Sequence, residues 1–266
     1  MATATSSAVM ADVNYQSDRS DGGIYSYGNP EIRRLNLVPL STRLVDMRQT
    51  KPSLDAEGFM LARHEIDGDW TKREWLDTVY LESCFDLVRR ETGASVVLPI
   101  YYPLVRSVIP AEGKADPARF LHIDQPREEF AAEVERLCGQ FGETFDERAH
   151  RAKIYNVWKA ISPPPQDQPL ALCDRRAIDP VDHVLGRNVE RNIASTTFLG
   201  IAPPREPLTL QYVPDLLVNE SLLFVLADLD PAAPLGVAHT AISAPPGERA
   251  LVPRQSVEMR VAALFD

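Results

Sequence analysis

Several features that mark common protein classes are scarce in this sequence. Its 266 residues contain 3 cysteines, and no Cys-x-x-Cys spacing occurs, which argues against a disulfide framework and against a thiolate zinc site. No apolar run approaches the ~20 residues needed to span a bilayer. The net charge is −10 and no run of Lys or Arg forms a basic stripe. Nucleic acids and anionic membranes are therefore poor candidate partners.

The remaining composition is typical of an ordinary soluble globular protein, with 44% hydrophobic and 25% charged residues. Residues 1–9 are small and polar, with no basic segment before an apolar stretch, so we expect no signal peptide. The odd number of cysteines fits a reducing compartment. We therefore predict a cytoplasmic protein.

The chain has no internal repeat and no change in composition that would divide it into two domains. Residues 1–30 are rich in Ser, Asp, Gly and Asn, and we predict that they form a flexible or surface-wrapping N-terminal arm. We predict that residues 31–266 form a single domain, which is a common size for a β-barrel.

Two segments have the apolar spacing of a helix. In residues 72–91 apolar side chains, Val79 among them, recur at i, i+3 and i+4. Residues 126–141 show the same pattern, with Phe141 on the apolar face and Pro126 in the first turn. Beyond residue 154, short apolar runs alternate with Pro-rich turns: 155–160, 170–173, 208–213, 222–226 and 257–264. This pattern predicts an α+β protein with helices flanking a jelly-roll, cupin-like core of antiparallel strands.

The His122-Ile123-Asp124 triplet is the most informative motif in the sequence. In an extended chain the side chains of His122 and Asp124 point to the same face, because they are two positions apart. Far downstream, His239 stands alone in an apolar, strand-like run. Two imidazoles and one carboxylate are the ligand set of a non-haem Fe(II) site. Taken separately, a polar strand face and a hydrogen-bonded core histidine are the simpler explanations. The order of His122, Asp124 and His239 along the chain favours the metal site.

Three other histidines compete for the place of the third ligand: His64, His150 and His183. None of them lies in an apolar, strand-like run comparable to that around His239.

An Arg-x-Ser pattern, Arg254 and Ser256, follows His239 and suits a site that uses 2-oxoglutarate. A guanidinium can bind the distal carboxylate of this diacid with two hydrogen bonds, and the hydroxyl can add a third. Arg249 and Arg260 are the alternative anchors. Asn156, on an aromatic-rich strand, is a candidate donor to 2-oxoglutarate or to substrate, although an Asn that satisfies a strand end explains it equally well.

The sequence resembles a family of non-haem iron oxygenases of natural-product biosynthesis. This family includes proteins of cephamycin 7-methoxylation, a fungal gibberellin desaturase and a fungal meroterpenoid endoperoxidase. The resemblance covers the chain from about residue 13 to its end. Its most specific segments are Asn-Val-Trp at 156–158, Pro-Leu-Ala-Leu-Cys-Asp at 169–174 and Arg-Gln-Ser-Val-Glu-Met-Arg at 254–260.

The resemblance implies a double-stranded β-helix fold, Fe(II) and 2-oxoglutarate. It implies His122, Asp124 and His239 as metal ligands and catalytic centre, and Arg254 and Ser256 as 2-oxoglutarate ligands, with Asn156 a weaker candidate. The expected function is a dioxygenase that uses O₂ to hydroxylate or desaturate an unactivated C–H bond of a small molecule, releasing succinate and CO₂. The alternatives are a jelly-roll metalloenzyme that does not use 2-oxoglutarate and a non-catalytic β-domain that binds a small molecule. A homodimer is possible, and the sequence does not identify the substrate.

Overall fold

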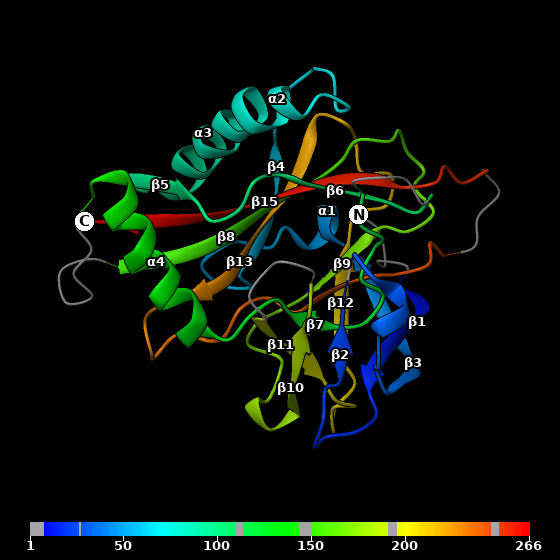
Figure 1. Cartoon of the computed structure of the whole chain (residues 1–266). Coiled ribbons are helices and arrows are strands. Elements are labelled where there is room, and N and C mark those ends of the chain that lie inside the picture. The colour runs from blue at the N-terminus through cyan, green and yellow to red at the C-terminus, as the bar shows by residue number, and fades with distance from the viewer. Residues whose placement is uncertain (1–7, 27, 110–113, 144–150, 191–195, 246–249) are drawn as a thin grey trace, which may run out of the picture.

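The computed structural model describes residues 8–26, 28–109, 114–143, 151–190, 196–245 and 250–266. Within these residues, most of the regular structure is strand, arranged in two sheets. Figure 1 shows the strands of the larger sheet below those of the smaller sheet, with α2 and α3 above the smaller one. The fold is thus mostly β with a few helices at its edges.

The larger sheet has nine strands in the described part of the chain. Their order from edge to edge is β1 (Val9–Gln16), β3 (Leu37–Asp46), β12 (Thr209–Tyr212), β9 (Leu170–Cys173), β14 (His239–Ala241), β7 (His122–Ile123), β11 (Thr196–Ile201), β10 (His183–Asn188) and β2 (Ile24–Tyr25). Strands β7 and β14 therefore pair near the middle of this sheet, although they are far apart in sequence.

The smaller sheet has six strands in the described residues. These are β4 (Phe59–Arg63), β13 (Glu220–Asp228), β8 (Arg151–Ala160), β15 (Gln255–Phe265) and β5 (Val96–Pro99), in that order, with β6 (Leu104–Ser107) also paired to β15. Four of the apolar runs predicted beyond residue 154 lie within observed strands, β8, β9, β13 and β15, and the run 208–213 contains β12 and extends one residue beyond it at each end.

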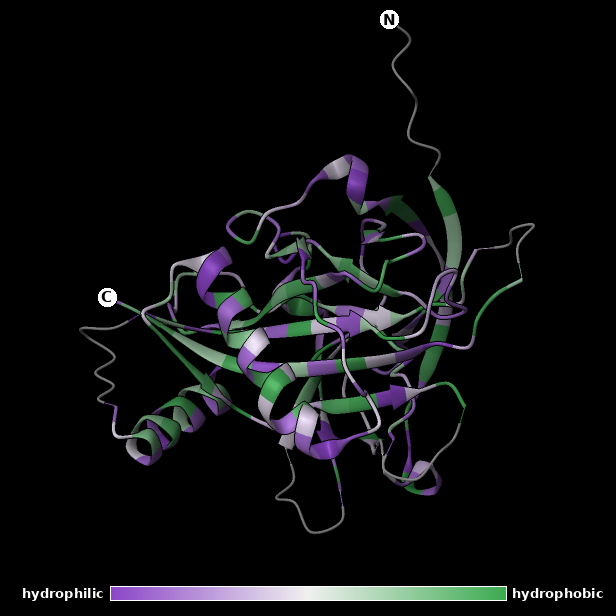
Figure 2. Cartoon of the chain, turned by 90° about the horizontal axis from the view of Figure 1, so that it is seen from above, coloured by the Kyte–Doolittle hydropathy of each residue, from purple (hydrophilic) through white to green (hydrophobic). Residues whose placement is uncertain are grey.

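The helical segments are α1 (Met47–Thr50), α2 (Arg73–Trp75), the π-helical η2 (Leu76–Tyr80), α3 (Leu81–Thr92), α4 (Arg127–Phe141) and the 3-10 turns η1 (Pro30–Ile32) and η3 (Pro180–Asp182). In Figure 2 the helices carry both hydrophobic and hydrophilic residues along their length, as expected for segments that cover a sheet on one side only.

The two predicted helices are present, with differences in detail. Val79 is 51% exposed, whereas the spacing placed it on the apolar face. It lies in η2, where a wider π turn shifts the angular position of the following side chains. Phe141, the last residue of α4, is 54% exposed, and Pro126 caps this helix instead of standing in its first turn.

The N-terminal segment contributes two strands to the larger sheet. Strand β1 pairs antiparallel with β3 along its whole length, and Val13 and Tyr15 are buried. Strand β2 pairs with β10. Residues 1–7 lie outside the described residues, and the division into an arm of 1–30 and a domain of 31–266 stays a prediction.

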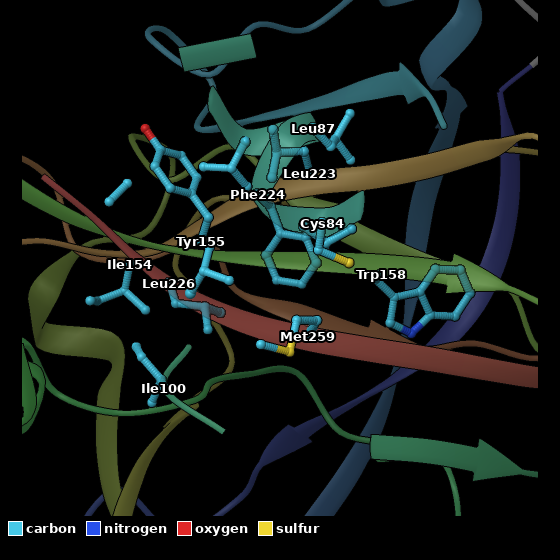
Figure 3. Close-up of a cluster of buried hydrophobic side chains, with 14 of the residues drawn as sticks. Cys84, Leu87, Ile100, Ile154, Tyr155, Trp158, Leu223, Phe224, Leu226 and Met259 are labelled. Carbon is cyan, nitrogen blue, oxygen red and sulfur yellow. The ribbon is translucent and has the colours of Figure 1, made fainter. Parts of the chain in front are cut away.

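The main hydrophobic core covers both faces of the smaller sheet and includes residues of α3, α4 and β9. Figure 3 shows side chains from α3, β8, β13 and β15 in this core, among them Leu87, Trp158, Leu223 and Met259. A second cluster lies in the larger sheet. The two clusters pack against the strands that carry the site described below. Within the described residues, no helix combines the length and apolar character needed to cross a membrane.

Candidate metal centre and co-substrate site

The larger sheet brings His122, Asp124 and His239 together. His122 on β7 and His239 on β14 are direct partners in the antiparallel pair. Asp124 Oδ1 lies 3.5 Å from His122 Nε2 and 3.7 Å from His239 Nε2. One ligand atom from each residue lies within 4.8 Å of the others, and all three side chains are buried. The same-face geometry predicted for His122 and Asp124 is therefore present in the structure.

Backbone carbonyls set the orientation of both imidazoles. His122 Nδ1 donates to the carbonyl oxygen of Phe120 at 2.8 Å, and His239 Nδ1 donates to that of Val237 at 3.1 Å. A carbonyl only accepts, so the ring proton lies on Nδ1 in each case. In a neutral imidazole with this tautomer Nε2 carries the lone pair, and both Nε2 atoms face the Asp124 carboxylate, so that a cation between the three atoms would complete the arrangement. Nδ1 hydrogen bonds of this kind commonly orient metal-binding histidines.

The protonation states of Asp124 and His239 also favour the binding of a cation by the cluster. Burial alone would raise the pKa of Asp124, but Arg260 and the two histidines outweigh it and hold the pKa well below its usual range. Burial lowers the pKa of His239 to about 4, although Asp124 opposes this shift. His239 is therefore neutral and Asp124 charged at neutral pH. Neutral imidazole nitrogens with one carboxylate form a donor set that fits Fe(II).

Arg254 is a buried cation, only 1% exposed, immediately before β15. One terminal nitrogen donates to the Gln168 carbonyl at 2.7 Å, and its Nε has no partner among the described residues. Its guanidinium lies over the Trp158 ring, 5.3 Å from the centroid. Burial lowers the pKa of Arg254 to about 9, with Arg106 as a second cause. A buried guanidinium with an unpaired N–H fits an anionic ligand such as a carboxylate.

Further unpaired polar atoms lie on the same face of the smaller sheet. Within the described residues, Ser256 Oγ and both amide atoms of Asn156 are buried without hydrogen-bond partners. Asn156 is the next residue after Trp158 on this face of β8, and it pairs with Phe224, whose ring lies 4.9 Å from that of His239. Arg254, Trp158, Asn156 and Phe224 are thus successive neighbours, and the last of them contacts His239 of the metal cluster. A short diacid that chelates a metal with one end and binds Arg254 with the other matches this order.

A cavity of about 170 Å³ opens beside the metal cluster. His122, Asp124 and Arg260 form part of its wall, and Tyr25, Tyr101 and Leu104 line it as well. Tyr101 is 43% exposed and Tyr102, also in the lining, is 67% exposed, so both lie toward the solvent side. The cavity thus offers an aromatic entrance that leads to His122 and Asp124.

Arg106 and Glu258 also belong to this site, although no motif in the sequence assigned a role to either residue. Arg106 donates to both carboxylate oxygens of Glu258, at 3.2 and 2.9 Å, and both side chains are buried. Both line the cavity. Glu258 lies between Ser256 and Arg260 in an alternating pattern, so strand parity already placed it on the same face. No sequence signal connected it with Arg106, on β6.

The competing residues lie elsewhere or outside the described residues. His64 is buried, and its ring nitrogens bond to Ser221 Oγ at 2.9 Å and to Ser83 Oγ at 3.1 Å. His183 begins β10, two strands from β7 in the sheet order. His150 and Arg249 are outside the described residues. Arg260 reaches the metal cluster itself, with a terminal nitrogen 3.3 Å from Asp124 Oδ2.

The fold and the buried His-Asp-His cluster define a β-sheet protein with a two-histidine, one-carboxylate centre. The chain belongs to the family described as oxidoreductase/YMDC permease-like domain, whose model matches residues 13–264. This match covers nearly the whole chain.

Two curated relatives are informative. The alpha-ketoglutarate-dependent dioxygenase phiK, from a fungal species (strain ATCC 74256), is 27% identical over 97% of this chain and 96% of its own length. The hydroxylase/desaturase efuI from Hormonema carpetanum is 28% identical over 70% of this chain and 68% of its own length. Together they confirm the resemblance to natural-product oxygenases found in the sequence.

A solved structure shares the fold. The iron and alpha-ketoglutarate-dependent endoperoxidase NvfI superimposes with a TM-score of 0.80 at 22% identity, over 96% of this chain and 97% of that chain. The Fe(II)/2-oxoglutarate-dependent dioxygenase nvfI from Aspergillus novofumigatus is 30% identical over 55% of this chain and 55% of its own length. The arrangement of two sheets with flanking helices is therefore one that an iron oxygenase adopts.

Proposed function

We propose that this protein is an Fe(II)/2-oxoglutarate-dependent dioxygenase that hydroxylates or desaturates an unactivated C–H bond of a small molecule. The convergence of two histidine Nε2 atoms on Asp124 Oδ1 carries the proposal, since both lone pairs are directed there by Nδ1 hydrogen bonds to backbone carbonyls. The relatives' names agree with this enzyme class and with iron and 2-oxoglutarate as its cofactors.

His122, Asp124 and His239 would hold the iron, and Arg254, Ser256 and Asn156 would hold 2-oxoglutarate. The proposed core is a double-stranded β-helix in which the two sheets face each other across the site. Bound iron and 2-oxoglutarate would supply the oxidising chemistry, with succinate and CO₂ as co-products.

The protein's own residues would bind and orient 2-oxoglutarate and the substrate, and they would exclude water from the site. Arg254 would neutralise the distal carboxylate of 2-oxoglutarate, and the Trp158 ring beneath it keeps this end dry. The buried Ser256 hydroxyl and Asn156 amide would pair with the remaining polar atoms. Substrate would enter past Tyr101 and place its C–H bond beside His122 and Asp124. Exclusion of water from such a site strengthens each of these electrostatic contacts.

The small-molecule substrate and O₂ are the proposed partners. The cytoplasmic location, the possible homodimer, and the exclusion of nucleic acid and membrane stay predictions. The three cysteines, all free and buried, support a reducing compartment.

Anaerobic titration of the apo protein with Fe(II), with and without 2-oxoglutarate, tests the proposal. We expect a visible charge-transfer band only when both are present, and its loss in His239→Ala. His183→Ala is the matched control, since it removes a half-buried histidine of the same sheet outside the cluster, and it should keep the band. Tight iron binding without a band would favour the metalloenzyme that does not use 2-oxoglutarate. Absence of iron binding would favour a non-catalytic binding domain.

A further inference from the structure

Arg260 and Asp124 form an ion pair that connects the metal cluster to the smaller sheet. Arg260 belongs to β15, and its terminal nitrogen lies 3.3 Å from Asp124 Oδ2, which is an ion-pair contact without hydrogen-bond geometry among the described residues. The other carboxylate oxygen, Oδ1, is the atom that faces both histidines. The two oxygens of one carboxylate therefore have different neighbours, a cation on one side and two imidazole nitrogens on the other.

A chain of alternating charges fixes the position of Arg260. Its terminal nitrogen lies 3.7 Å from Glu258 Oε1, and Glu258 is held by two hydrogen bonds from Arg106. Arg106 in turn donates to the Asp116 carbonyl at 2.9 Å. On the cavity side, the Tyr101 ring lies 5.8 Å from the Arg260 guanidinium. Arg260 thus has carboxylates on two sides and a ring on a third, which limits its freedom to turn toward a ligand.

From this geometry we infer that Arg260 is a positioning residue that holds the outer oxygen of Asp124, so that Asp124 offers one oxygen to the metal. The inference rests on the proposed function. A bound iron would offer six positions, and two histidines and one carboxylate oxygen would fill three of them. A second oxygen from Asp124 would fill a fourth and leave too few for a two-point keto acid and O₂. Arg260 would thereby preserve the space for the co-substrate without touching it.

The competing assignment is that Arg260 binds the distal carboxylate of 2-oxoglutarate directly. Pyruvate separates the two roles, because it has the same chelating keto acid as 2-oxoglutarate but lacks the distal carboxylate. A residue that acts through Asp124 affects both keto acids equally. A residue that binds the distal carboxylate affects 2-oxoglutarate alone.

The experiment measures the dissociation constants of 2-oxoglutarate and pyruvate for the anaerobic, iron-saturated protein from the charge-transfer band. For Arg260→Gln we expect both constants to rise by the same factor, about tenfold, as for other groups that orient a metal ligand. Arg254→Gln is the matched control and should weaken 2-oxoglutarate while leaving pyruvate unchanged. Arg260→Lys, which retains the cation, should lie closer to the wild type and serves as the test if Arg260→Gln does not fold.

Two results would overturn the inference while leaving the proposed function intact. The first is wild-type binding of both keto acids by Arg260→Gln, and the second is a loss confined to 2-oxoglutarate. A structure of the iron-loaded proteins gives an independent readout: Asp124 should bind through one oxygen in the wild type and through two in Arg260→Gln. Failure of the wild type to bind iron would instead refute the proposed function.

Discussion

His122 and His239 lie directly opposite each other on neighbouring antiparallel strands, with ring centroids 4.6 Å apart. Each donates its Nδ1 proton to the carbonyl two residues before it in the chain. The same local hydrogen bond therefore sets both rings, and it depends only on the backbone of each strand. Backbone hydrogen bonds within each strand thus give both imidazoles the orientation that the proposed metal centre requires.

Replacement of Asp124 by Ala should abolish iron binding. Asp124 supplies the only anionic oxygen of the described cluster, and its loss would leave Arg260 beside two imidazoles without the carboxylate between them. Anaerobic Fe(II) titration measures the effect. Asp182→Ala is the control, since Asp182 is a buried, ion-paired carboxylate associated with the same sheet and should leave iron binding intact. Full iron affinity in Asp124→Ala would contradict the assigned ligand set.

Replacement of Arg254 by Gln should raise the apparent KM for 2-oxoglutarate by about 10- to 100-fold, the effect of losing hydrogen bonds between charged partners at a buried position. Ser256→Ala removes a single neutral hydroxyl, and we expect about a threefold to tenfold rise. Steady-state kinetics with varied 2-oxoglutarate measures both. An unchanged KM in Arg254→Gln would move the anchor to another arginine.

The stability of the apo protein should fall as the pH decreases from 6.5 to 4. Burial lowers the pKa of His64 and of His239 to about 4, from an ordinary value of 6.5. Between pH 6.5 and 4 these histidines bind protons in the unfolded chain but stay neutral in the folded protein, so acid favours unfolding. Above pH 6.5 their contribution to the free energy of unfolding is fully present. Urea unfolding should show a loss on the order of a few kcal/mol across the window.

The variant His64→Gln isolates one of these two contributions. His64 lies outside the metal cluster, and a Gln amide can still bond to Ser221 and Ser83, which the imidazole contacts in the native protein. The pH slope of the unfolding free energy should therefore be smaller in this variant. An equal slope would show that His64 does not titrate differently in the folded and unfolded states.

Cys84 and Cys173 should resist thiol reagents in the native protein. Both are fully buried, and burial raises the pKa of each thiol to about 12, whereas the thiolate is the reactive form. Labelling at pH 8 followed by mass spectrometry should find both unmodified in the native protein and modified in urea. Rapid native labelling of either would mean that its strand or helix opens readily.

The sequence predicted local features of this protein better than relationships between distant segments. The periods of the apolar residues located the long helix and the strands, because burial on one face determines both. The position of Val79 was wrong, since spacing rules assume an uninterrupted α-helix and η2 is π-helical. The proximity of His122, Asp124 and His239 was predicted correctly, because these residue types in this order are typical of one kind of metal site, and their role as ligands stays a prediction.

Arg106 and Arg260 show where sequence reasoning reached its limit. The sequence offered Arg260 only as an alternative anchor for 2-oxoglutarate, and its contact with Asp124 joins two sheets and has no counterpart in sequence spacing. The pairing of Arg106 with Glu258 likewise depends on β6 lying beside β15. Such contacts follow from the packing of distant segments, and a single sequence carries no direct signal for them.

The two ends of the site belong to different sheets, with the proposed iron ligands on the larger sheet and its edge, and Arg254 and Ser256 on the smaller one. A molecule bound at both ends is therefore a crosslink between the sheets. Succinate keeps the carboxylate that suits Arg254 but lacks the keto acid that chelates iron. Co-substrate and co-product would then differ in how they hold the two sheets, since 2-oxoglutarate would bind the iron as a chelate, whereas succinate offers the iron a single carboxylate in place of the chelate.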